Sequence, residues 1–374
     1  MEHDIEKLKP SIKEAAKRIQ KAVEDRALII IRHHADCDGY CGALAIEEVI
    51  HPIIKNENSK PWQKYKRLPM RTPFYDYPDA LRDLSFFKDN LEYDKKPLLV
   101  IIDNGSGEED LLALKRIKMY NISIIILDHH VFSKEVDQIV DIHLNPRKSG
   151  ATGDITSGML GFEVANILGK ANPLYAALSG VSDKSSDKIL KPYMSLVPKR
   201  PFLEKLAKCV DFEAYNMRFM ESDLIYDLFN DNQKKIMNIL LPEIDKREEA
   251  YKKVIQKFLK KEAAGKIKLF SFDIGSNSIM GEYPTAGKLV GIAHRMNTGS
   301  RITIGHTDNF MSFRVENLDF SITEILKTLK QKIPFGKIGG GGHDYAGTIK
   351  FVPGVKEKVL KELVSYLKKI KIRN

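Results

Sequence analysis

The stretch that decides the fold runs from Ala27 to Gly39 and reads Ala-Leu-Ile-Ile-Ile-Arg-His-His-Ala-Asp-Cys-Asp-Gly. Its first five residues, Ala27 to Ile31, are fully apolar and predict a short buried strand. Acidic and imidazole side chains follow at the carboxyl end of that strand, and Gly39 to Ile50 then predicts a helix. The stretch therefore predicts a strand that delivers polar ligands into a turn before a helix.

Asp36 and Asp38 are two residues apart within this turn. In an extended chain, residues i and i+2 point to the same side, so both carboxylates can reach one site. The alternative for either residue alone is an aspartate that caps the helix that follows. Other acidic and imidazole residues that follow apolar segments decide between a shared binding site and a helix cap.

Three later apolar segments also end in acidic or imidazole residues. They are Asp103 after Pro97–Ile102, Asp128-His129-His130 after Asn121–Leu127, and Asp183 after the predicted helix Asn172–Ser182. Apolar strands that alternate with helices predict a parallel sheet covered on both faces, and ligands bind such sheets beyond the carboxyl ends of the strands. Any one of these residues alone could be a turn carboxylate. Together they predict a site for hard divalent cations such as Mn²⁺ or Mg²⁺.

Length and composition limit the class of protein. A chain of 374 residues with 43% apolar and 29% charged residues predicts a soluble protein of two domains. We expect no membrane span, no secretory signal and, with only three cysteines, a cytoplasmic location. The net charge of +10 permits a polyanionic partner, although solvated lysines on helices explain it equally well.

The predicted domains are a catalytic, metal-binding domain over residues 1–242 and a smaller α/β domain over residues 265–374. A charged helix over residues 243–264 connects them, with Gly265 as its stop. In the smaller domain the pattern predicts strands near Ile267–Phe272, Leu289–His294, Arg301–Gly305 and Phe310–Val315.

Two motifs in the second domain indicate phosphate binding. Consecutive glycines at Gly339–Gly342, followed by His343, allow backbone N–H groups to approach an anion closely. A flexible loop is the equally good alternative. Arg314, in Ser312-Phe313-Arg314, can grip a phosphate through two hydrogen bonds, although a strand-end arginine is usually only solvated.

These motifs resemble those of a known family. His34-Ala-Asp36-Cys-Asp38-Gly39, Asp103-Asn-Gly-Ser, Asp128-His129-His130 and Gly180-Val-Ser-Asp183 resemble the four motifs of the DHH phosphoesterase superfamily. Ser312-Phe-Arg314 and Gly340-Gly-Gly-His-Asp-Tyr-Ala-Gly347 resemble the DHHA1-type C-terminal domain of its RecJ and nanoRNase branch. The greatest likeness is to archaeal RecJ-like single-strand exonucleases. The sequence departs from the family at Tyr40 and Cys41, where threonine or serine is usual.

The resemblance implies a ligand set for two Mn²⁺ ions, with Mg²⁺ as a possible substitute. One ion would be bound by His34, Asp36 and Asp103, and the other by Asp38, Asp103, His129 and Asp183. Asp103 would bridge the ions, His130 would contact a phosphate oxygen, and Asp128 would orient its neighbours. The implied substrate-binding residues are Ser312, Arg314, Gly340, Gly341, Gly342 and His343.

The function that the resemblance implies is hydrolysis of single-stranded DNA or RNA to 5′-mononucleotides. The alternative within enzymes is a phosphodiesterase for very short oligonucleotides or cyclic dinucleotides, which would use the same active site. A non-catalytic replisome scaffold is disfavoured, because every metal-ligand position is filled. A replication or repair protein is a further expected partner.

Overall fold

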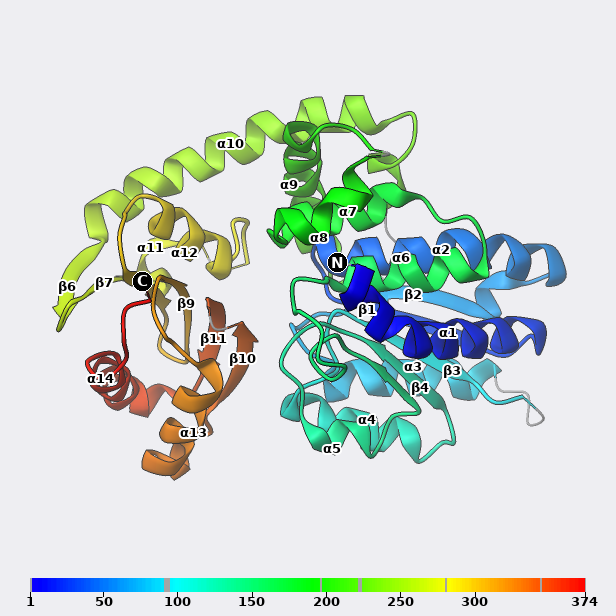
Figure 1. Cartoon of the computed structure of the whole chain (residues 1–374), viewed down its shortest axis with the longest axis horizontal. Helices are drawn as coiled ribbons and strands as arrows, with labels where there is room; N and C mark the ends of the chain where they lie inside the picture. The colour runs from blue at the N-terminus through cyan, green and yellow to red at the C-terminus, as the bar shows by residue number, and fades with distance from the viewer. Residues whose placement is uncertain are drawn as a thin grey trace. The chain divides into compact units, whose positions relative to one another are not determined.

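The computed structural model describes residues 2–90, 95–195, 197–220, 224–279, 281–343 and 345–373. The chain forms two compact units, Met1–Leu241 and Pro242–Asn374 (Figure 1). Among the described residues, none of the helices combines the length and the apolar character that crossing a bilayer requires.

The first unit is built on a five-stranded sheet in the order β2-β1-β3-β4-β5, in which every neighbouring pair is parallel. Its strands are β1 Ile29–His33, β2 Tyr65–Pro69, β3 Leu98–Ile102, β4 Ser123–Leu127 and β5 Ile142–Leu144. β1, β3 and β4 are buried along their whole length, because helices cover both faces of the sheet. The predicted parallel sheet is therefore confirmed.

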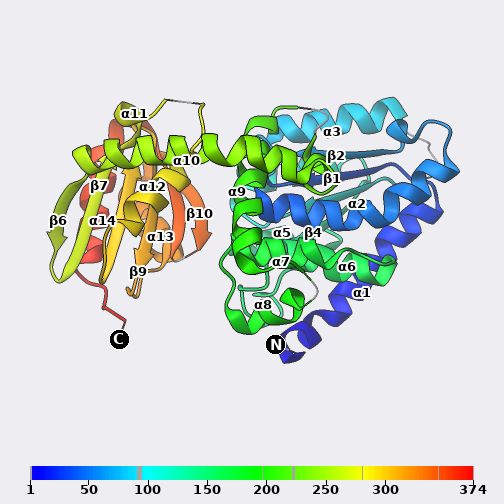
Figure 2. The same ribbon diagram turned by 90° about the horizontal axis from the view of Figure 1, so that it is seen from above.

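Helices pack on both faces of this sheet (Figures 1 and 2). The α-helices are α1 Glu2–Glu24, α2 Cys37–Glu57, α3 Tyr77–Asn90, α4 Leu111–Lys118, α5 Lys134–Asp137, α6 Ser157–Leu168, α7 Pro173–Ser182, α8 Asp187–Met194 and α9 Arg200–Met217. Single 3₁₀ turns are η1 Pro61–Gln63, η2 Glu108–Asp110 and η3 Ile225–Leu228. Alternate strand residues point to opposite faces, so Ile30, Ile101 and Ile126 pack with the α3–α5 side.

Glycines let α2 and α6 approach each other closely on the other face. A Cβ placed on Gly161 would lie 2.5 Å from the carbonyl oxygen of Gly42, and a Cβ on Gly42 would lie 3.0 Å from that of Ser157. The first distance is shorter than any side chain permits without movement of a helix, and the second is tighter than most Cβ contacts. This close approach sets the start of α6 beside the start of α2, where the acidic residues lie.

Two predictions for the first unit differ from the structure, and one strand was not predicted. The first strand, predicted over Ala27–Ile31, is β1 Ile29–His33, so the first of the two histidines continues the strand. The following helix, predicted over Gly39–Ile50, begins at Cys37 with Asp36 as N-cap and ends at Glu57. The sequence pattern gave no sign of β2, because Tyr65–Pro69 carries two basic residues; it is an edge strand that pairs with β1.

The second unit contains a six-stranded sheet in the order β10-β11-β9-β8-β7-β6, antiparallel except for the β7–β8 pair. Its strands are β6 Lys260–Ala264, β7 Ile267–Asp273, β8 Arg301–His306, β9 Phe310–Glu316, β10 Gly339–His343 and β11 Ala346–Lys350. Its helices are α10 Gln233–Phe258, which begins in the first unit, α11 Ile274–Asn277, α12 Ala286–Arg295, α13 Ile322–Lys332, α14 Lys356–Leu367, η4 Pro334–Gly336 and η5 Pro353–Val355. The predicted α/β class of this unit is confirmed.

Three segments of this unit differ from the prediction. Leu289–His294 is part of the helix α12, because Thr285 caps it and its apolar residues follow helical spacing. The helix predicted over residues 243–264 is α10, which begins ten residues earlier and contains Pro242. Its predicted last turn is instead β6, paired with β7 through a turn at Gly265, where φ is +67°.

The glycine-rich segment Gly339–His343 is also not a flexible loop, because it forms the strand β10 and pairs with β11. Glycine is required there at two positions. Gly340 and Gly342 have φ of 128° and 119°, and a Cβ on Gly340 would lie 2.1 Å from the carbonyl oxygen of Thr348.

The approach of α2 and α6 predicts a stability change. Gly161→Ala should lower the free energy of unfolding of the first unit by about 1–3 kcal/mol, because the new methyl group overpacks the contact with Gly42. Urea denaturation followed by circular dichroism measures this change. Gly354→Ala is the matched control, since a Cβ there meets nothing within 4 Å, and it should change stability by less than about 0.5 kcal/mol. An unaltered stability in Gly161→Ala would contradict the packing argument.

Candidate metal centre

The carboxyl ends of the parallel strands place the acidic residues at one edge of the sheet. Backbone hydrogen bonds continue past each strand and hold these ends in register. The N–H of His34 donates to the carbonyl of Ile102 at 3.1 Å, that of Asp103 to Leu127 at 2.9 Å, and that of Asp128 to Leu144 at 3.1 Å. The first three predicted motifs are therefore neighbours because β1, β3 and β4 are neighbours.

One group of candidate ligands consists of His34, Asp36 and Asp103, whose ligand atoms lie within 4.8 Å of one another. His34 Nδ1 lies 2.7 Å from a carboxylate oxygen of Asp36 and 3.3 Å from one of Asp103. The other oxygen of Asp36 accepts a hydrogen bond from Gly39 N at 3.0 Å. Asp36 thus caps α2 and also faces this group, so its role as a cap leaves its other oxygen available to a metal ion.

A second group consists of Asp38, Asp103 and His129, and all three are buried. His129 Nε2 lies 3.6 Å from Asp38, 3.6 Å from Asp103 and 3.4 Å from Asp183. The other ring nitrogen, Nδ1, lies 3.0 Å from the carbonyl oxygen of Gly153, to which it can donate. That hydrogen bond directs the Nε2 lone pair toward the three carboxylates, an arrangement typical of a histidine that binds a metal.

Asp103 belongs to both groups and has an unusual backbone. Its φ is +64°, a left-handed conformation that costs energy in a residue other than glycine. Ser157 Oγ donates to one of its oxygens at 3.0 Å. The backbone conformation turns the carboxylate from the end of β3 into the space between the two groups.

Asp38 is held by residues that the sequence analysis did not identify. The first N–H groups of α6 donate to its two oxygens, Ser157 N at 3.0 Å and Gly158 N at 2.7 Å, and Ser179 Oγ of α7 donates to one of them. A helix N-terminus stabilises a negative charge. The signal in the sequence was Thr156-Ser157-Gly158, an N-cap followed by small residues, but nothing in it indicated a distant carboxylate.

Asp128 and His130 form a third group of possible ligands, again with Asp103, whose Oδ1 lies 3.8 Å from His130 Nδ1. Oδ1 of Asp128 accepts from His130 Nδ1 at 2.8 Å and from the backbone N–H of His129 at 2.9 Å. These contacts fix the turn that follows β4. Arg147 also supports it, since its Nε donates to the carbonyl oxygen of His129 at 2.9 Å.

Asp211 of α9 is a further carboxylate that the sequence analysis did not place. It accepts a hydrogen bond from the backbone N–H of Cys37 at 2.9 Å and so supports the first turn of α2. Its segment, residues 187–241, carried no recognisable motif.

The electrostatics of the groups differ from those of ordinary surface carboxylates. Burial, together with the negative charges of Asp38 and Asp36, raises the pKa of Asp103 well above its usual value. The same causes raise the pKa of Asp183 well above its usual value. Burial opposes the charge on His34, but the neighbouring Asp36 outweighs it and raises the pKa of the imidazole to about 9. A cation would relieve this repulsion between carboxylates and would displace the proton of His34.

The donor set therefore fits divalent metal ions. Mixed carboxylate and imidazole ligands suit Mn²⁺, Mg²⁺ and similar ions. Two groups that share Asp103 would hold two ions, with Asp183 beside the second group. The acidic clusters can bind metal, and they do not by themselves define which ion.

The predicted residues of the second unit also lie together, within that unit. Arg314 of β9 pairs with Ala346 of β11, and Ala346 pairs with His343 of β10, so the three residues form a row across the sheet. Ser312 is on β9, and its Oγ lies 3.0 Å from Thr348 Oγ1. Asp344 of the predicted motif lies outside the described residues.

Known proteins resemble this chain in sequence and in fold. The model of the N-terminal domain of the DHH family matches residues 27–178. A solved DHH domain from a member of the S1p family of ribosomal proteins, PF0399, is 31% identical over 99% of this chain and 93% of that chain, with a TM-score of 0.89. The chain belongs to the DHH family.

Other relatives of this DHH protein are more distant or longer. The uncharacterized protein MJ1198 of Methanocaldococcus jannaschii is 33% identical over 98% of this chain, and the chain spans 55% of its length. RecJ of Thermus thermophilus in complex with Mn²⁺ is 13% identical over 97% of this chain and 55% of that chain, with a TM-score of 0.65. The likeness to RecJ is one of fold. Together these comparisons confirm the resemblance to DHH phosphoesterases with a RecJ-like fold.

The support of Asp38 predicts a change in metal affinity. A Cβ on Gly158 would lie 2.4 Å from the Cβ of Ser179 and 3.0 Å from Asp38 Oδ1. Gly158→Ala should therefore displace Asp38 and weaken Mn²⁺ binding by roughly 10–100-fold, as loss of a supporting contact does. Isothermal titration calorimetry measures the affinity, and Gly354→Ala serves as the control. Wild-type affinity in a folded Gly158→Ala protein would contradict this role.

Proposed function

We propose that this DHH protein is a two-metal phosphodiesterase that hydrolyses single-stranded DNA or RNA to 5′-mononucleotides. The observation that carries the proposal is the pair of ligand groups that share Asp103. A phosphodiester carries a negative charge that increases during hydrolysis, and two adjacent cations suit that chemistry. The RecJ exonuclease solved with manganese, which has a TM-score of 0.63 to this chain, supports the same class of activity by analogy of fold.

In this proposal His34, Asp36 and Asp103 hold one Mn²⁺ or Mg²⁺ ion, and Asp38, Asp103, His129 and Asp183 hold the other. When bound, the ions lower the pKa of water and stabilise the charge that develops at phosphorus. The protein contributes orientation. Gly153 fixes the ring of His129, the start of α6 fixes Asp38, and the backbone of Asp103 points its carboxylate to both groups.

His130 has the role of contacting a phosphate oxygen. Burial alone would raise the pKa of Asp128, but the neighbouring His130 outweighs it and holds that pKa below its usual range. The ionised Asp128 in turn orients the His130 ring through the hydrogen bond to Nδ1. Asp128 is thus a positioning residue.

In the second unit, Ser312, Arg314, Gly340, Gly341, Gly342 and His343 are proposed to bind the phosphates of the substrate. Arg314 and His343 are in one row across the sheet, which suits contacts with a single phosphate group. A Cβ placed on Gly341 meets nothing within 4 Å, so the backbone of β10 is open to a ligand at that residue.

Asp103→Asn tests the shared ligand. Asparagine tolerates a positive φ and nearly preserves the shape, so the fold should remain while one charge is lost. Hydrolysis of a labelled 15-nucleotide strand with Mn²⁺ should fall by at least roughly 10²–10³-fold in kcat. Asp25→Asn, at the end of α1, is the control and should leave the rate unchanged. Full activity in a folded Asp103→Asn protein would exclude the shared role.

Arg314→Ala tests the second unit. Loss of a phosphate contact that is made equally in the ground state and the transition state should raise KM and leave kcat little changed. Steady-state kinetics on the same strand, with Arg314→Lys as the conservative variant, separates the two constants. An unaltered KM would contradict substrate binding by Arg314.

The same assay distinguishes polymer from dinucleotide substrates. The proposal expects shortening of the labelled strand to mononucleotides. Hydrolysis of a dinucleotide alone would replace the proposed function with a short-oligonucleotide phosphodiesterase. Hydrolysis of neither substrate, in a protein that binds Mn²⁺, would reject the proposal.

A further inference from the structure

A basic groove lies beside the edge strand β2 of the first unit. Among the residues that the structure describes, five basic side chains and no acidic one line it: Arg32, Lys66, Arg71, Arg82 and Arg218. The cavity has a volume of about 50 Å³, and Phe86 and Met220 complete its wall. Residues from β2, from α3 and from the end of α9 thus meet in one place, although they are far apart in sequence.

The groove lies next to the metal centre along the same edge of the sheet. Pro69 pairs with His33, and the N–H of Met70 donates to the carbonyl of His33 at 2.8 Å. Met70 is therefore level with His34, one strand away, and Arg71 follows it directly beyond the end of β2. A chain bound at the metal centre can continue into the groove within this unit.

The positive charge of the groove faces outward. The nearby carboxylates of Asp79 and Asp83 are buried, and Arg32 pairs with both from beneath, with Nη2 2.6 Å from Asp83 and Nη1 3.7 Å from Asp79, so that Arg32 and Arg82 together balance the two negative charges. Arg82 also contacts Asp79, at 3.0 Å, and keeps a side chain that is 40% exposed. Lys66, Arg71 and Arg218 consequently give this surface a field that attracts a polyanion.

An exposed aromatic ring sits among these cations. Phe219 is 57% exposed, and the guanidinium groups of Arg218 and Arg71 lie 4.4 and 5.8 Å from its centroid. Lys66 lies 4.8 Å over the ring of Phe86 in the same way. Cations that hold phosphates, beside aromatic faces on which bases stack, are the combination that binds single-stranded nucleic acid.

The framework of the groove is rigid. Arg32 also donates to the carbonyl of Pro69 at 3.2 Å, Tyr75 donates to Asp83 at 2.9 Å, and the N–H of Arg71 donates to Asp79 at 3.4 Å. These buried contacts tie β1, the end of β2 and α3 together. Ordering of the backbone on binding therefore costs little free energy.

We propose that this groove binds the single-stranded nucleic acid substrate away from the hydrolysed bond, with a phosphate between Arg71 and Arg218 and a base stacked on Phe219. The identity of the bound strand as substrate rests on the proposed function, but the binding itself does not require hydrolysis. Duplex nucleic acid is not the expected occupant, because its bases already stack on one another and cannot stack on Phe219.

Binding is tested on the full chain in EDTA, which prevents hydrolysis, by fluorescence anisotropy with labelled 15-nucleotide dT and rU strands. Arg71→Ala/Arg218→Ala should weaken binding of the strand by at least about tenfold. The slope of log Kd against log salt should fall by about 0.7, because the two arginines contact one phosphate. Phe219→Ala should weaken binding by roughly 5–150-fold through lost stacking and leave the salt slope unchanged.

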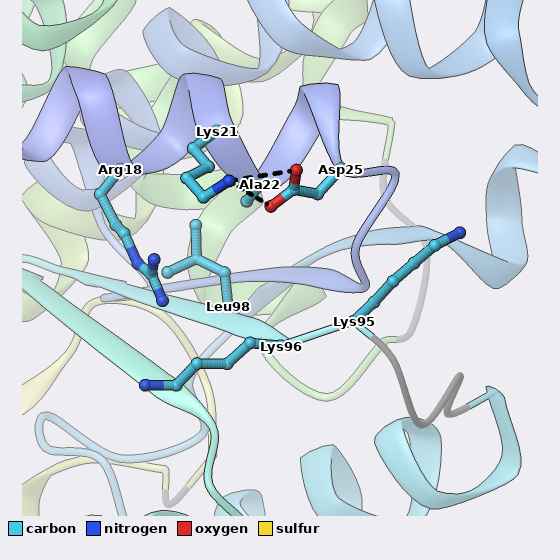
Figure 3. A pocket seen from close by; sticks show the side chains of 7 residues that line it. All are labelled: Arg18, Lys21, Ala22, Asp25, Lys95, Lys96 and Leu98. Atoms are coloured by element: carbon cyan, nitrogen blue, oxygen red, sulfur yellow. Dashed lines mark hydrogen bonds and ion pairs between the residues drawn. The ribbon is translucent and has the colours of Figure 1, made fainter.

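The control removes the same charge from the opposite edge of the sheet. A cavity of about 490 Å³ at the amino end of β3 is lined by Arg18, Lys21, Lys95 and Lys96, with Asp25 paired to Lys21 (Figure 3). Lys21→Ala/Lys96→Ala should change the affinity by less than about twofold. The proposal is overturned if this variant weakens binding as much as Arg71→Ala/Arg218→Ala, or if the groove variants bind like the wild type while circular dichroism shows them folded.

Hydrolysis is measured separately, so that the two proposals can fail separately. With Mn²⁺, kcat/KM is measured for the 15-mer and for a dinucleotide, and the first value is divided by the second. This ratio should be lower in the groove variants than in the wild type by about tenfold or more, because only the longer strand reaches the groove. Weakened binding without any hydrolysis by the wild type would support the groove and reject the proposed function. If the wild type hydrolyses the strand but the groove variants keep both their affinity for it and their ratio of kcat/KM values, the groove proposal is rejected and the proposed function stands.

Discussion

Repulsion between carboxylates at the edge of the first sheet is the constraint on which the rest of the structure depends. Asp38, Asp103 and Asp183 surround one imidazole nitrogen at 3.4–3.6 Å, and the first two carboxylates are buried. Like charges at this spacing oppose folding unless a cation or a proton neutralises them. The fold holds these groups together with backbone hydrogen bonds that run on past β1, β3 and β4. The favourable free energy of forming the parallel sheet therefore offsets the unfavourable repulsion between these carboxylates.

Small residues on the covering helices make that arrangement possible. Gly42 and Gly161 bring α2 and α6 together, and Gly158 lets the first N–H groups of α6 reach the oxygens of Asp38. A larger side chain at any of these positions would move the donor helix away from the carboxylate. The same glycines thus serve helix packing and the geometry of the candidate metal centre.

Sequence patterns predicted part of this structure for physical reasons that can be named. Apolar runs such as Leu98–Ile102, rich in β-branched residues and bounded by turn residues, are typical of strands buried on both faces, and ligands beyond their carboxyl ends follow from parallel pairing. The strand Tyr65–Pro69 was not predicted, because its place at the edge of the sheet tolerates Lys66 and Arg67. Likewise, α12 was predicted as a strand, because an apolar run as short as Leu289–His294 fits the residue spacing of a helix as well as that of a strand.

The supporting contacts could not be predicted from the sequence. Ser157, Ser179 and Gly153 act on ligands more than 20 residues away, through the start of α6, a hydroxyl group on α7 and one backbone carbonyl group. No local pattern records such a contact, since each depends on how α6 and α7 pack against α2. The groove beside β2 could not be predicted from the sequence for the same reason, because Arg71 and Arg218 come together only in the folded unit.

The most direct measurement of the central claim is crystallographic. Crystals of the protein grown with Mn²⁺, with diffraction recorded at the manganese absorption edge, reveal the ions themselves. The account predicts two anomalous peaks on either side of Asp103, one beside His34 and Asp36, and one beside Asp38, His129 and Asp183. A single peak remote from Asp103, or none at saturating Mn²⁺, would contradict it.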